Sequence, residues 1–92
     1  MRLRYTRRGA AELAAILAHI AAASPQGARR VQKRVQAITT LLTQRPHAGQ
    51  IAGRGHLRRM VASPYPYLVF YQVREQEIVI HGVRHAARRP LA

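Results

Sequence analysis

The chain has 92 residues, which suits one domain with a small hydrophobic core. Its 16 Lys and Arg residues against 3 Asp and Glu give a formal net charge of +13, while a hydrophobic content of 48% excludes an intrinsically disordered chain. The absence of Cys excludes disulfides, thiolate nucleophiles and cysteine metal sites. Such charge predicts a polyanionic partner: nucleic acid, an anionic surface or an acidic protein segment. The alternative is a basic domain whose charge is simply solvated.

The N-terminal half begins with a short strand and a helix. Leu3-Arg4-Tyr5 alternates as a strand does, and Thr6 is a suitable helix N-cap. Residues 10–23 are rich in Ala, the best helix former, and carry one apolar stripe at helical spacing: Leu13, Ile16, Leu17 and Ile20. The sequence therefore predicts an edge strand followed by an amphipathic helix.

A second helix is expected directly after the first. Ser24 can cap it, Pro25 suits the first helical position, and the helix should end near Gln44 because Arg45 precedes a proline. Its apolar stripe is Ala28, Val31, Val35, Ile38 and Leu42. Two apolar stripes joined by so short a link predict an antiparallel helical hairpin.

Beyond the hairpin the hydrophobic period changes from that of helices to that of strands. Residues 47–55 contain three glycines and should form a loop, and residues 57–62, 67–73 and 78–83 are strand candidates. Glu75-Gln76 supplies a hairpin turn, and the last two strands are apolar on both faces, which predicts central positions. The predicted fold class is α+β, with β-α-α-β-β-β order, a helical hairpin packed on an antiparallel-rich sheet, and one domain over residues 1–92.

The residues that usually carry enzyme chemistry are scarce. The only acidic residues are Glu12, expected on an exposed helix face, and Glu75 and Glu77, expected in a solvated turn. This distribution argues against paired-carboxylate catalysis and magnesium-dependent phosphoryl transfer. His81 and His85 have no carboxylate or thiolate beside them, and the glycine loop lacks the flanking elements of a phosphate loop. No metal and no cofactor are predicted.

Basic residues are plentiful in the sheet half of the chain, where Arg58 or Arg59 on one strand is expected to approach Arg84 on another. Such a cluster recognises an anion or is held by one. The members of the basic set are Arg54, Arg58, Arg59, Arg84, Arg88 and Arg89. The aromatic residues interleaved with them are better explained as core than as a base-stacking platform.

Several segments, in order and over nearly the whole chain, resemble the ParE branch of the RelE/ParE superfamily of bacterial toxins. They are Tyr5-Thr6 before an Ala/Leu/Ile helix, Ser24-Pro25 with Arg29 to Val31, Pro46-His47-Ala48-Gly49, Leu57-Arg58-Arg59-Met60-Val61, Pro64-Tyr65-Pro66-Tyr67-Leu68-Val69-Phe70-Tyr71, and Val83-Arg84-His85 with Ala87-Arg88-Arg89-Pro90. The resemblance implies a type II toxin–antitoxin toxin that is neutralised by a cognate antitoxin. A basic toxin favours an acidic antitoxin segment.

The resemblance implies two different targets. RelE-like members cleave mRNA on the ribosome without a metal, using basic residues and a tyrosine or His–Tyr pair near the C-terminus, whereas ParE-like members lack this set and poison DNA gyrase. This chain ends without a terminal tyrosine, and Ser63 and Ala86 stand about where RelE-like toxins carry arginines. The resemblance therefore favours gyrase inhibition by binding.

The residues expected to bind the target are Arg58, Arg59, Arg84, His85, Arg88 and Arg89. If the chain is instead a ribosome-dependent nuclease, the catalytic residues are expected to be His85, Arg84 and Arg58. A third alternative is an inactive basic binding module that contacts nucleic acid. No stretch has the roughly 18 apolar residues of a membrane helix, so no membrane partner and a cytoplasmic location are expected.

Overall fold

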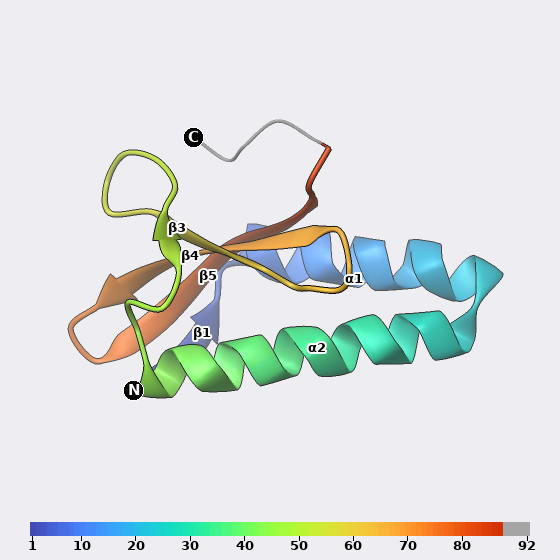
Figure 1. The fold of residues 1–92 in the computed structure, drawn as a ribbon, viewed down its shortest axis with the longest axis horizontal. Helices are drawn as coiled ribbons and strands as arrows, with labels where there is room; N and C mark the ends of the chain where they lie inside the picture. The colour runs from blue at the N-terminus through green and yellow to red at the C-terminus, as the bar shows by residue number, and fades with distance from the viewer. Residues whose placement is uncertain (88–92) are drawn as a thin grey trace.

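A helical hairpin packs against a five-stranded sheet in the computed structural model, which describes residues 1–87 (Figure 1). This arrangement confirms the predicted α+β class. The elements are β1 (Arg2–Tyr5), α1 (Arg7–Ala23), α2 (Pro25–Gln44), β2 (Gln50–Ile51), β3 (Arg58–Val61), β4 (Tyr67–Arg74) and β5 (Glu77–His85). Neither helix combines the length and apolarity needed to span a bilayer within residues 1–87.

Both helices begin at the caps that the sequence indicates. The side-chain oxygens of Thr6 and Ser24 accept hydrogen bonds of 2.9 Å from the backbone N–H groups of Gly9 and Gly27, three residues into each helix. These bonds satisfy donors that the first helical turn leaves unpaired. The bounds of α2 are as predicted, whereas α1 begins at Arg7 instead of residue 10.

The sheet has the strand order β1-β5-β4-β3-β2, so β4 and β5 hold the interior positions expected of them. All pairings are antiparallel except the parallel pairing of β1 with β5, in which Arg2 lies opposite Glu77 and Tyr5 opposite Ile80. The two-residue strand β2 was not predicted, because its segment had been assigned to the glycine loop. It pairs with β3 at the far edge of the sheet.

The main core lies between α2 and the inner face of the sheet. The predicted stripe of α2 is buried along its whole length, and Val69, Tyr71, Ile78 and Ile80 are completely inaccessible to solvent. Burial of such side chains contributes about 1.5–3 kcal/mol each. The prediction for α1 was wrong: its four stripe residues are only half-buried. The outer face of the sheet carries a smaller cluster of Leu57, Leu68 and Phe70.

Candidate functional site

Helix α1 takes the place of a neighbouring strand along the second half of β5. Strand β1 ends at Tyr5 opposite Ile80, while β5 continues to His85. The Thr6 N–H donates to the Ile80 carbonyl over 3.0 Å, and α1 then runs beside β5. A Cβ atom on Gly9 would lie 2.5 Å from the Ile80 carbonyl oxygen. Glycine at this position therefore permits the close approach of the helix to the strand.

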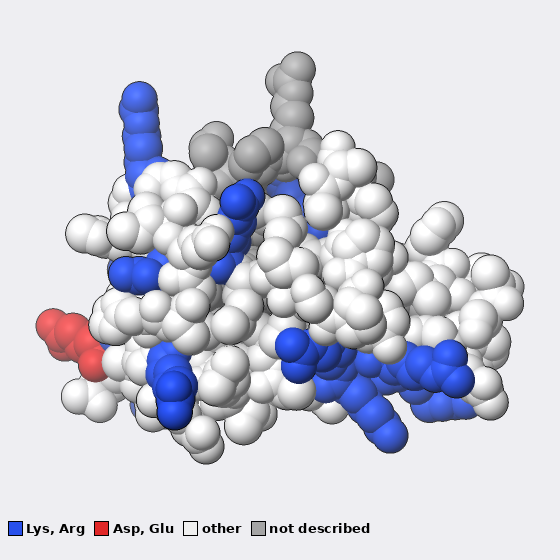
Figure 2. All heavy atoms as spheres, in the orientation of Figure 1, with Lys and Arg blue, Asp and Glu red and all other residues white. Residues whose placement is uncertain are grey.

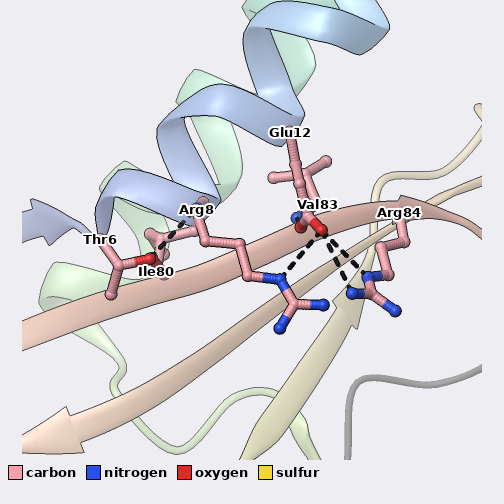
Figure 3. A network of polar contacts seen from close by, with 7 residues as sticks. Thr6, Arg8, Glu12, Ile80, Val83 and Arg84 are labelled. Atoms are coloured by element: carbon pink, nitrogen blue, oxygen red, sulfur yellow. Dashed lines mark hydrogen bonds and ion pairs between the residues drawn. The ribbon is translucent and has the colours of Figure 1, made fainter.

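The carboxylate of Glu12 completes the edge of β5 (Figure 3). Its Oε1 accepts the Val83 N–H at 3.1 Å, and its Oε2 is 3.3 Å from Arg84 Nε, 3.2 Å from Arg84 Nη2 and 3.3 Å from Arg8 Nε. The carboxylate thus supplies the acceptor that a neighbouring strand would otherwise provide. The expectation of an exposed Glu12 was wrong, because this side chain is only 24% exposed.

A groove of about 550 Å³ opens between α1 and the ends of β4 and β5. Its polar contributors are Glu12, His19, Tyr67, Arg84 and His85. Tyr67 and His85 are register partners, and their rings meet edge to face with centroids 5.6 Å apart and an interplanar angle of 89°. The groove therefore has aromatic rings on one side and an arginine held by Glu12 beside them. This arrangement suits an anionic or peptide ligand.

The imidazole of His85 is exposed at the rim of this groove. Its Nδ1 accepts the backbone N–H of Ala87 over 3.1 Å, so the neutral ring carries its proton on Nε2. No carboxylate bonds this ring within residues 1–87. The contact with Tyr67 is a ring contact rather than a hydrogen bond.

Arg58 holds a loop in place and does not lie at the groove. Its Nη1 donates to the Gly49 carbonyl at 2.7 Å and to the His47 carbonyl at 3.4 Å. Arg58 is opposite Tyr71 on β4, whereas Arg84 is opposite Leu68. The two register positions are about 10 Å apart along β4. The expectation that Arg58 approaches Arg84 is therefore wrong, and the alternative approach of Arg59 to Arg84 stays open.

The other predicted arginines lie elsewhere. Arg59 is opposite Phe70 and Arg84 is opposite Leu68, and these two apolar partners belong to the outer-face cluster. Cross-strand partners share a face, so Arg59 and Arg84 belong to the outer face. Arg88 and Arg89 lie outside the described residues. The structure thus brings the predicted Arg84 and His85 together with Glu12 and Tyr67, which the sequence did not single out.

Tyr71 forms hydrogen bonds with the same loop from inside the core. Removing its hydroxyl gives a first testable prediction. The buried hydroxyl donates to the Pro46 carbonyl at 2.8 Å and accepts the Gly49 N–H at 2.9 Å. Tyr71→Phe should lower the free energy of unfolding by about 1–3 kcal/mol, because two buried backbone groups lose their partner. Urea denaturation measures this loss. Tyr65→Phe is the control, since no hydrogen bond of its hydroxyl is found in residues 1–87, and an equal loss there would contradict the assignment.

Alkaline pH should lower the stability of the fold, because the same hydroxyl loses its proton. Burial raises the pKa of Tyr71 above its usual 10.0, while the hydrogen bond with Gly49 and the charge of Arg58 oppose the rise. The fold therefore favours the protonated phenol, and this contribution is complete below pH 10.0 and is lost as the pH rises toward the folded-state pKa. Tyr71→Phe should lose less stability than the wild type above pH 10.0 in the same denaturation series.

Sequence reasoning missed Glu12 and Tyr67 as members of the site. One available signal for Glu12 was the Arg8 four residues before it, which forms an ion pair with it along α1. The contact of Tyr67 with His85 depends on the register between two strands, and this register cannot be read from the sequence. Among residues 1–87, no group of three or more metal-binding side chains lies together.

Comparison with known proteins identifies the family. The family model for the ParE toxin of the type II toxin–antitoxin system parDE matches residues 3–90. The chain belongs to this family. Toxin RelE2 of Caulobacter vibrioides is 36% identical over 84 residues, which cover 91% of the chain and 93% of that protein. A solved structure of the chromosomal ParDE TA system from P. aeruginosa aligns over 92% of this chain and 95% of that chain with a TM-score of 0.79 and 24% identity.

Proposed function

We propose that this type II toxin of the ParE/RelE family inhibits DNA gyrase by binding it and does not cleave mRNA. The single observation that carries the proposal is the environment of His85. Of the two groove histidines, His19 and His85, only His85 follows Arg84 on β5, and its Nδ1 is engaged by the chain's own backbone. The membership of the chain in the ParE toxin family supports the same choice.

Metal-independent RNA cleavage makes three demands on a protein. The 2′-oxygen must lose a proton, the charge developing on the phosphorus centre must be stabilised, and the leaving oxygen must gain a proton. Arg84 can meet only the second demand, because a guanidinium does not give up a proton at neutral pH. His85 has only Nε2 left for proton transfer, and the other groove histidine, His19, forms no hydrogen bond with it within residues 1–87. No paired base and acid are therefore assembled from the two imidazoles, and most of the rate enhancement is missing.

A binding mechanism uses the same residues differently. Arg84 is held by Glu12 in one orientation, which lowers the entropic cost of binding a target carboxylate or phosphate. We include Arg59 and His85 in the target surface, together with Arg88 and Arg89 from the sequence. Arg58 contributes by holding the loop at Gly49. The cognate antitoxin would present an acidic segment that covers this basic surface.

Purified gyrase and a translated message test the proposal together. Added toxin should stop the supercoiling of relaxed plasmid and cause cleaved DNA to accumulate, while primer extension on the message should show no cuts. Arg84→Gln should weaken inhibition by about tenfold or more, the loss of one charge-assisted contact. Arg45→Gln is the matched control, because this exposed arginine follows α2 at the other end of the molecule.

The alternative function is a ribosome-dependent mRNA endonuclease, and the contact between Tyr67 and His85 favours it. This pair places a phenol and an imidazole beside Arg84 without any terminal tyrosine. Cuts at fixed codon positions that disappear in both Tyr67→Phe and His85→Ala variants would support the nuclease and contradict gyrase inhibition. Neither cuts nor gyrase inhibition would leave the third alternative, a basic binding module.

A further inference from the structure

Four cationic side chains project from the N-terminal half of α2 and are far from the target surface in sequence. They are Arg29, Arg30, Lys33 and Arg34, called the α2 basic ridge below, and all four are exposed. Figure 2 shows Lys and Arg side chains gathered over this helix. The patch does not depend on the charge of the groove, because α1, β4 and β5 form the groove.

The spacing of the ridge residues places them on one side of the helix. At about 100° per residue, positions i, i+1, i+4 and i+5 cover an arc of roughly 140° and rise only about 7.5 Å along the axis. Val31, Val35 and Ile38 fill a different arc, where they are buried. The four cations therefore form a continuous strip directed at solvent.

The charge of this strip is not neutralised by any ion pair found within residues 1–87. Helix α2 contains no acidic residue. Glu12 pairs with Arg8 and Arg84, and Glu77 pairs with Arg4, so the ion pairs found in residues 1–87 leave out the ridge. Like charges four residues apart on a helix destabilise it by about 0.2–0.5 kcal/mol per pair. A bound polyanion would relieve this repulsion.

One ridge residue is held in a fixed position. Arg34 Nε donates to the Ser63 carbonyl over 2.6 Å, which fixes its guanidinium against the turn before β4. A planar, oriented guanidinium binds phosphate oxygens in a bidentate manner at a lower entropic cost than a free side chain. The neighbouring Arg30 extends from the same helix and adds a second group of this type.

We propose that the α2 basic ridge binds the sugar–phosphate backbone of nucleic acid without reading its sequence. The chemistry of the exposed surface favours nucleic acid over an acidic protein segment. Protein interfaces place apolar or aromatic anchors at their centre. The exposed large apolar residues of the described chain all lie outside α2: Met1, Leu3, Ile51 and Val61. Beside the cations α2 exposes only small or polar side chains, among them Gln26, Ala37 and Thr40.

The salt dependence of binding tests this proposal on the full chain. A labelled duplex DNA and a labelled single-stranded RNA are titrated with wild-type protein and with an Arg29→Gln/Arg30→Gln/Lys33→Gln variant. Each phosphate contact adds about −0.9 to the slope of log Kobs against log salt on duplex DNA. The variant should therefore lose about 2.7 of that slope and bind roughly tenfold or more weakly at low salt. Duplex and single strand distinguish which nucleic acid binds better.

A charge-matched control distinguishes a defined surface from general basicity. Arg2→Gln/Arg7→Gln/Arg45→Gln removes the same three charges from exposed positions outside the ridge. For this control the slope of log Kobs against log salt should stay within about 0.9 of the wild-type slope, the value of one phosphate contact. Equal losses in the two variants would overturn the proposal in favour of non-specific attraction. Tighter binding to a poly-glutamate peptide than to either nucleic acid would assign the ridge to an acidic protein partner. Both results are independent of gyrase inhibition.

Discussion

A Val35→Asp substitution should unfold the protein. Val35 lies in the middle of α2 and is only 1% exposed, packed between the helices and the sheet. An aspartate there would be an unpaired buried charge, which costs several kcal/mol, and the stability of small domains is itself about 5–15 kcal/mol. Circular dichroism should show no cooperative thermal transition for this variant.

Ala37→Asp is the matched control for the same helix. Ala37 is exposed two residues further along α2, so its aspartate remains hydrated. This variant should melt within a few degrees of the wild type. A normal transition for Val35→Asp would mean that α2 does not turn this stripe toward the core.

A second large effect is expected at Gly9. In a helix interior, Gly→Ala usually stabilises by about 0.5–1 kcal/mol. Here the new methyl group would be 2.5 Å from the backbone oxygen of Ile80, so α1 must move away from β5. We expect a loss of about 2–3 kcal/mol, because the displacement strains the Thr6 and Glu12 hydrogen bonds to β5. For a domain of this size the melting temperature should fall by about 8–24 °C.

Gly27→Ala provides an unusually close control. Gly27 has the same place in α2 as Gly9 has in α1, and each donates its N–H to the capping hydroxyl. An added Cβ at Gly27 would approach only side-chain atoms of Ser24 and Ile20, at 3.1–3.3 Å. Its stability should change by less than about 1 kcal/mol. If the two variants behave alike, the contact of α1 with β5 is not as close as described.

Local patterns were sufficient to predict most elements of the fold. Ser24-Pro25 marked the boundary between the helices, and the turn at Glu75-Gln76 separated two apolar strands. Gln50–Ile51 was missed because two residues carry no periodic signal. The half-burial of the α1 stripe was missed because hydrophobic periodicity indicates which face turns inward but not how completely the sheet covers it.

The candidate site was harder to predict because its contacts join distant parts of the chain. Glu12 and Val83 are separated by 71 residues, and their hydrogen bond exists because β1 is shorter than β5. Tyr67 meets His85 only through the register of β4 on β5. Arg58 was expected to bind an anion of the target, whereas the acceptors that it contacts within residues 1–87 are two backbone carbonyls of the loop.

The pairing of the first strand with the last has a consequence for synthesis of the toxin. Strand β5 joins β1 to the rest of the sheet, and Arg2 lies opposite Glu77. A nascent chain therefore cannot close its sheet until β5 has left the ribosome. Chains that end before β5 lack the strand that pairs with both β1 and β4. Folding of the sheet thus waits for a contact between segments far apart in the sequence.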